Sequence, residues 1–154
     1  MTELEVKQRR AVVAEARSWL GTPYHHMGRV KGAGVDCAML PAEVYAACGM
    51  IPRQEVSFYP MDWNMHRGGE RYLAQVLEHA VEVEEAPQPG DLVLWRYGRC
   101  LAHGAIVLEW PRIIHAVVRL GVVLDDGLSP SLMRERRDGR PRERHVYSLW
   151  RARP

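Results

Sequence analysis

The feature that most constrains the fold is a change in the spacing of apolar residues at the turn Pro87-Gln88-Pro89-Gly90-Asp91. Before this turn, apolar residues recur three and four positions apart, which is the period of an amphipathic helix. After it, short apolar runs alternate with glycine, proline and charged residues, a pattern typical of β-strands. Helices followed by an antiparallel sheet predict an α+β fold class, in which N-terminal helices pack on a C-terminal sheet.

The expected elements follow from these patterns along the chain. Helices are predicted over 2–20, 37–48 and 70–80, and strands over 92–97, 103–110, 113–118, 122–124 and 145–150, the last at a sheet edge. The segment 126–144 is predicted to be a charged loop with one helical turn near Leu132. Neither an internal repeat nor a change of composition divides the chain, so residues 1–154 are expected to form a single domain.

Composition and charge disfavour several classes of protein. The formal net charge is only +2, and acidic residues interrupt the arginines near the C-terminus, so nucleic acid is not an expected partner. No apolar stretch is long enough for membrane insertion, and residues 1–10 lack the apolar run of a signal peptide, which predicts synthesis in the cytoplasm. The three cysteines, Cys37, Cys48 and Cys100, form neither a disulfide framework nor a close-spaced metal site, which suits a reducing compartment.

Cys37 is the candidate nucleophile. It follows a glycine-rich loop, and apolar residues at helical spacing begin beside it. A helix containing Pro41 must begin close to Cys37, because proline has no N–H for an interior helical hydrogen bond. Unpaired N–H groups and the helix dipole at such a position favour the thiolate, which is the nucleophilic form of cysteine. The alternative is that Cys37 is a small buried hydrophobic residue.

Two histidines supply the partners that a nucleophilic cysteine needs. His103 begins one predicted strand and His115 lies on the next, twelve residues later. A hairpin that bends near Pro111 places them side by side, so one can act as general base and the other can orient it. Zinc bound by the cysteine and both histidines is an alternative, but structural zinc sites usually have close-spaced ligand pairs. We therefore predict neither a metal nor another cofactor.

Five motifs, in this order, resemble those of the NlpC family, the papain-like cysteine peptidases of the bacterial cell wall. They are Gly21-Thr22-Pro23-Tyr24, Asp36-Cys37, Pro89-Gly90-Asp91-Leu92-Val93-Leu94, His103-Gly104-Ala105-Ile106-Val107 and Ile114-His115-Ala116. The resemblance runs from about residue 10 to residue 125 and includes the spacing of the two histidines. It implies a papain-like fold and peptidase activity without a metal.

The resemblance also implies a role for each site residue. Cys37 is the implied nucleophile, His103 the general base and His115 the residue that orients the base. Tyr24 is implied to line the active site, and Asp36 to bind the free amine of a peptidoglycan stem peptide. The family cleaves amide bonds in these peptides, typically between D-glutamate and the following diamino acid.

The chain departs from the family pattern beside the nucleophile. Ala38 and Met39 follow the cysteine, where family members usually have serine and glycine, so a substrate-binding hydroxyl is lost and bulk is gained. The pair His25-His26 replaces a common aromatic-glycine pair. The aromatic stretch after residue 50 is expected either to rebuild the substrate site or to cover it; it includes Tyr59, Trp63 and His66.

Two stretches, 31–37 and 59–63, are similar to the phage and prophage branch of the family and to its relatives in gene transfer agents. That similarity implies a protein carried on a phage-like tail, with tail-tip or hub proteins as partners, which opens the cell wall for genome delivery. One alternative is a structural tail-tip protein that has lost turnover. A cytoplasmic peptidase that recycles cell-wall peptides, or a toxin effector with the same chemistry, is another.

Overall fold

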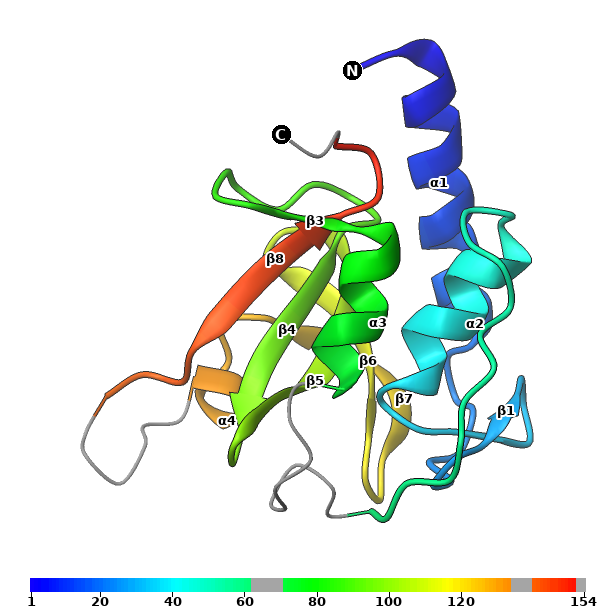
Figure 1. Cartoon of the computed structure of the whole chain (residues 1–154), viewed down its shortest axis with the longest axis vertical. Coiled ribbons are helices and arrows are strands. Elements are labelled where there is room, and N and C mark those ends of the chain that lie inside the picture. Colours follow the sequence, from blue (N-terminus) through cyan, green and yellow to red (C-terminus); the bar gives the residue numbers. More distant parts are fainter. Residues whose placement is uncertain (62–70, 134–139, 152–154) are drawn as a thin grey trace.

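The computed structural model describes residues 1–61, 71–133 and 140–151. Its helices are α1 (Glu3–Ser18), α2 (Met39–Ala47), α3 (Arg71–His79) and the short α4 (Pro130–Met133). The first three helices lie on one side of a twisted antiparallel sheet (Figure 1). This arrangement confirms the predicted α+β class. No helix among the described residues is both long and apolar enough to cross a membrane.

The main sheet has six strands in the order β3-β8-β4-β5-β6-β7. These are β3 (Val81–Val83), β4 (Leu92–Tyr97), β5 (Cys100–Glu109), β6 (Arg112–Val117), β7 (Gly121–Asp126) and β8 (Arg144–Ser148). The prediction that the last strand is an edge was wrong, because β3 pairs with its outer side, with Val81 opposite Ser148. A strand of three residues is too short to show an alternating pattern, so β3 left no signal in the sequence.

A small two-stranded sheet precedes α2 and holds the loop that leads to Cys37. Its strands are β1 (Arg29–Val30) and β2 (Gly34–Val35), in a segment that the sequence indicated only as a glycine-rich loop. Gly34 is required there because a Cβ at this position would lie 2.7 Å from the Cβ of His25. The backbone N–H of Val35 also donates to the carbonyl of Pro23 at 3.1 Å. The approach to the cysteine is therefore held by backbone packing and hydrogen bonds.

Both faces of the central strands are buried. One face contributes residues such as Leu94, Ile106 and Ile114 to the main core, which packs against α1, α2 and α3. The opposite face forms a second cluster that includes Trp95 and, from α4, Leu132. This double burial explains why β4 and β5 read as nearly continuous apolar runs. The predicted helical turn near Leu132 is confirmed as α4.

Arg9 links α1 to the sheet and to the end of the chain. Its side chain is 3% exposed and donates to Glu5 Oε1 and to Asp91 Oδ1, both at 2.9 Å. It also donates to the carbonyl of Pro89 at 2.8 Å, and its guanidinium lies 4.1 Å from the ring centroid of Trp150. This one cation therefore joins the first helix, the turn before β4 and the residues after β8.

Candidate active site

Cys37 lies at the N-terminal end of α2, two residues before its first helical residue. The carboxylate of Asp36 caps this end, since Oδ1 accepts from the backbone N–H of Ala38 at 3.1 Å and of Met39 at 2.8 Å. The first helical hydrogen bond runs from Leu40 N–H to the Asp36 carbonyl at 3.1 Å. The predicted location of the cysteine at a helix start is thus observed, and a buried carboxylate orients the turn that carries it.

The carboxylate of Asp36 is enclosed by donors from its own chain. It is 2% exposed, and its second oxygen, Oδ2, accepts from Met27 N–H at 2.8 Å and from the Tyr59 hydroxyl. His26 Nε2 donates to the backbone carbonyl of Tyr59 at 2.6 Å, which fixes the position of this residue. An ammonium group approaching Asp36 therefore has to share Oδ2 with Tyr59 or displace its hydroxyl. The role of Asp36 in amine binding stays a prediction.

His103 and His115 form a hydrogen-bonded pair. They lie on β5 and β6, which pair as a hairpin with Ile106 opposite Ile114. His103 Nε2 and His115 Nδ1 are 2.8 Å apart, and the two ring centroids are 5.0 Å apart. The predicted hairpin therefore brings the two imidazoles into direct contact.

The chain of side chains continues to a residue that the sequence analysis missed. Asp125, on β7, approaches His115 Nε2 with its Oδ2 at 2.9 Å. In the ladder between β6 and β7, His115 pairs with Val123 and Ile113 with Asp125. The predicted strand ended at Leu124, two residues before the end of β7, so Asp125 fell between that strand and the charged loop predicted from residue 126. Residues two apart on a strand share a face, so the spacing of Asp125 from Val123 was the signal that could have identified it.

One cavity of about 260 Å³ connects the candidate residues. The side chains around it include Tyr24, Asp36, Cys37, Tyr59, His103 and Val118. The hydroxyl of Tyr24 donates to Cys37 Sγ at 3.9 Å, and the thiol points to the carbonyl of Ala102 at 3.8 Å. Within the part of the chain that the structure describes, no hydrogen bond joins Sγ to His103. The thiol and the imidazole thus line one cavity without a hydrogen bond between them, and direct proton transfer requires them to come closer.

Both groups are neutral near pH 7. Burial, together with the negative charge of Asp36, raises the pKa of the Cys37 thiol to about 12. Hydrogen bonds from the Tyr24 hydroxyl and from backbone N–H groups lower this pKa by less, so the predicted benefit of the helix N-terminus is outweighed. Burial lowers the pKa of His103 to about 3, and the nearby His115 and Arg142 act in the same direction. The site therefore contains a thiol and a neutral imidazole, not a thiolate–imidazolium ion pair.

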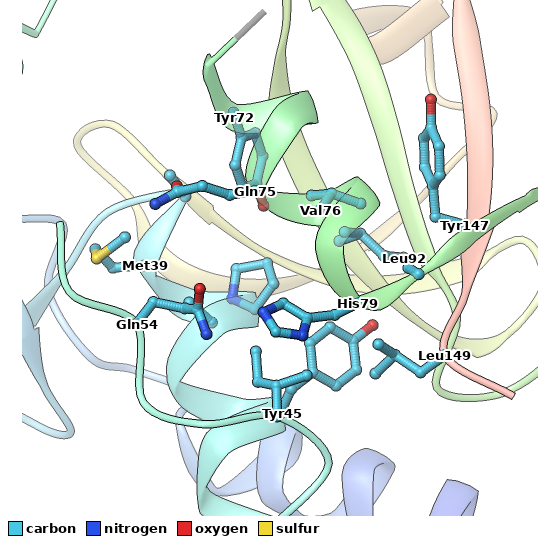
Figure 2. A pocket seen from close by; sticks show the side chains of 15 residues that line it. Met39, Tyr45, Gln54, Tyr72, Gln75, Val76, His79, Leu92, Tyr147 and Leu149 are labelled. Carbon is cyan, nitrogen blue, oxygen red and sulfur yellow. The ribbon is translucent and has the colours of Figure 1, made fainter.

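Met39 packs away from this cavity. Its side chain, 3% exposed, lines a separate apolar cavity of about 50 Å³ between α2, α3 and β8 (Figure 2). Tyr45, Tyr72 and Leu92 form other walls of that cavity. Ala38 lines both cavities, so of the two unusual residues only Ala38 faces the candidate site. Of the aromatic stretch after residue 50, Tyr59 reaches the site, whereas Trp63 and His66 lie outside the described residues.

The described residues contain no group of three or more histidine, cysteine, aspartate or glutamate side chains arranged to hold a metal ion. What the site does contain is a thiol and an imidazole on one cavity, with a second imidazole and a carboxylate behind the first. Such a set suits nucleophilic attack on a carbonyl carbon with general-base assistance.

Comparison with known proteins identifies relatives of the whole fold. The model of the NlpC/P60 family matches residues 21–137. The NlpC/p60 domain of the peptidoglycan hydrolase SagA is 23% identical, with 90% of this chain and 97% of that chain covered and a TM-score of 0.53. A Staphylococcus aureus protein of the family, described as similar to lipoprotein, is 25% identical over 92% of this chain, with a TM-score of 0.56. This chain covers 42% of that protein.

A third relative differs in activity. RipD from Mycobacterium tuberculosis is described as a non-catalytic NlpC/p60 domain protein adapted to a peptidoglycan-binding function. It is 15% identical, with 92% of this chain and 97% of that chain covered and a TM-score of 0.53. No curated protein sequence matches the chain. The fold is therefore found in a peptidoglycan hydrolase and also in a protein without catalysis.

Proposed function

The chain belongs to the NlpC/P60 family, and we propose that it is a cysteine endopeptidase that hydrolyses amide bonds of peptidoglycan stem peptides. The family match confirms the resemblance and the papain-like fold predicted from the motifs. The observation that carries the proposal is that His103, hydrogen-bonded to His115, lines the same cavity as Cys37. That geometry and the chemistry of thiols and imidazoles support the roles proposed for these residues.

In the proposed reaction, Cys37 Sγ attacks the carbonyl carbon of the scissile amide while His103 takes the thiol proton. The same imidazole then gives that proton to the leaving amine, which leaves an acyl-enzyme thioester that water hydrolyses. Because the free thiol has a raised pKa, proton transfer and attack must be coupled in the complex. Attack requires Sγ and His103 to approach each other, since Sγ is directed to the carbonyl of Ala102.

The bond between D-glutamate and the following diamino acid is the proposed cleavage site, by analogy with the family motifs. Tyr24, whose hydroxyl contacts Sγ, lines the proposed substrate site, and Asp36 is the proposed partner of the free amine. Ala38 lacks the hydroxyl that the family commonly offers to this amine. Tyr59 is the proposed source of a replacement hydroxyl, because its own hydroxyl donates to Asp36 Oδ2.

The test is the hydrolysis of purified stem peptides by the wild type and by C37S. We expect new amino groups and two peptide fragments with the wild type, and a loss of roughly three orders of magnitude or more with C37S. The matched control is C48S, because Cys48 lies at the opposite end of α2 and is absent from the lining of the site. Equal hydrolysis by C37S and the wild type would contradict the proposal.

A second candidate function is a stem-peptide-binding protein without turnover. It is favoured by the protonated thiol, by the missing Sγ–His103 bond and by the precedent of RipD. The same samples distinguish the two functions. Saturable binding of stem peptides by the wild type, with no fragments after prolonged incubation, would support the binding protein.

We also propose, from the similarity of 31–37 and 59–63 to tail-associated relatives, that the chain acts on a phage-like tail with tail-tip or hub proteins as partners. In that setting one domain, residues 1–154, would open the wall during genome delivery. The peptide assay does not depend on this proposal. Co-purification of the chain with tail particles would support the tail role, and particles free of the chain would contradict it.

A further inference from the structure

We propose that Asp125 is a positioning residue that sets the proton positions on both histidines, so that His103 presents an unprotonated nitrogen to Cys37. The inference deepens the proposed function, on which its consequence for activity rests. It starts from the continuous series of contacts from His103 through His115 to Asp125, at 2.8 Å and 2.9 Å.

The series has only one member that is restricted to accepting hydrogen bonds. A neutral imidazole has one nitrogen that donates and one that accepts, and either nitrogen can carry the proton. An ionised carboxylate only accepts. Asp125 therefore requires the proton of His115 to lie on Nε2, the nitrogen 2.9 Å from its Oδ2.

The second step follows from the first. With its proton on Nε2, neutral His115 has a lone pair on Nδ1, so the proton between the two rings must come from His103 Nε2. Neutral His103 then has no proton on Nδ1. This nitrogen has no hydrogen-bond partner among the described residues and is free to accept the proton of Cys37 Sγ. Without the carboxylate, the reversed arrangement is equally allowed, and it would leave His103 with a proton where the base needs a lone pair.

The described residues around His103 are aromatic or cationic, and the carboxylate in contact with the pair is that of Asp125. His103 packs against the rings of Trp95 and Tyr97, with centroids 6.1 Å and 5.2 Å away. Arg142, whose guanidinium lies 3.7 Å from the Tyr97 ring centroid, opposes a positive charge on His103. Asp125 raises the pKa of His115, against the effect of burial. The carboxylate thus offsets the cation and stabilises the imidazolium that forms when His103 takes the thiol proton.

The protons balance within the pair of reacting groups. The S–H bond of Cys37 breaks and an N–H bond forms at His103 Nδ1, while the protons on His103 Nε2 and His115 Nε2 stay in place. Asp125 is 30% exposed and accepts a hydrogen bond throughout, without taking a proton. Its role is therefore orientation and electrostatic support through His115.

The experiment reads proton positions directly and activity separately. Protein labelled with ¹⁵N-histidine is studied by long-range ¹H–¹⁵N NMR near pH 7, as wild type, D125L and D125A, with E109Q as the control. Glu109 is an exposed carboxylate at the end of β5, so E109Q removes the same charge far from the pair. Hydrolysis of stem peptides is measured on the same samples.

We expect Nε2-protonated signals for both histidines in the wild type and in E109Q, and Nδ1-protonated forms in D125L and D125A. Activity should fall about 10- to 100-fold in both Asp125 variants, the range found when a metal-bound histidine loses the partner that orients it. A wild-type His115 with its proton on Nδ1 overturns the inference, as do variants with unchanged proton positions. A wild type with the expected proton positions and no hydrolysis contradicts the proposed function and leaves the assignment of Asp125 standing.

Discussion

His103 illustrates at the residue scale how burial decides protonation. The sequence identifies it as a candidate base, but a histidine in water has a pKa near 6.5. In the fold, burial and neighbouring groups lower that pKa to about 3, so the native protein keeps the ring neutral over the whole range in which the unfolded chain becomes charged. The neutral form is the one that can accept a proton from Cys37.

This difference predicts how stability depends on pH. Between about pH 6.5 and pH 3 the unfolded chain binds a proton at His103 that the native protein does not, so the free energy of unfolding falls as the pH is lowered through this window. H103Q should have a flatter dependence there, measured by urea unfolding at a series of pH values. H25Q, which changes an exposed histidine, is the control. If the free energy of unfolding of H103Q depended on pH as steeply as that of the wild type, His103 would not be the origin of the effect.

At the scale of elements, the contact between α3 and β5 is set by Gly104. A Cβ at this position would lie 2.6 Å from the Tyr72 hydroxyl and 3.3 Å from a methyl group of Leu94. The Tyr72 hydroxyl is buried with no hydrogen-bond partner among the described residues, and the ring is 8% exposed. The helix can therefore lie against the strand that carries His103 only because the strand has no side chain there.

We expect G104A to lower the free energy of unfolding by about 1–3 kcal/mol, because an added methyl group in a packed core forces its neighbours to move. Y72F removes the atom that the new methyl group meets first, so the double variant should lose less than the sum of the two single effects. Chemical denaturation of the four proteins measures this difference. If the effects of G104A and Y72F on the free energy of unfolding simply added, the Tyr72 hydroxyl would not be the group that sets the distance between α3 and β5.

At the scale of the whole molecule, Arg9 joins parts of the chain that are far apart in sequence. Its buried ion pairs with Glu5 and Asp91 connect α1 to the start of β4, and its contact with Trp150 adds the residues after β8. A cation with this burial is stable only while its partners remain, since an unpaired buried charge is costly.

We therefore expect R9L to destabilise the protein by about 3–5 kcal/mol, the usual cost of leaving a buried carboxylate without its partner. R10L, which removes an exposed cation from the neighbouring position, should change stability by less than about 0.5 kcal/mol. Adding D91L to R9L should recover part of the loss. Thermal and urea unfolding measure all three, and an R9L protein as stable as R10L would contradict the role of the ion pairs.

Local patterns in the sequence were sufficient to predict the first three helices and five of the six strands of the main sheet, and to indicate the candidate residues Cys37, His103 and His115. Helix and strand periods are properties of neighbouring residues, and the hairpin that joins the two histidines is itself a local structure. The position of the cysteine before α2 also follows from nearby residues, Asp36 and Pro41. Fold class and candidate chemistry therefore belong to what the sequence alone determined.

Tertiary structure decided the features that depend on distant pairing and on burial. The place of β8 inside the sheet depends on β3, more than sixty residues earlier in the chain. The contact of Asp125 with His115 depends on the register of β7, and the contact of Tyr59 with Asp36 depends on the path of the chain after α2. The neutral thiol of Cys37 is a consequence of burial, which no local pattern measures. The sequence indicated the candidate reacting groups, whereas packing determined their protonation and the carboxylate behind them.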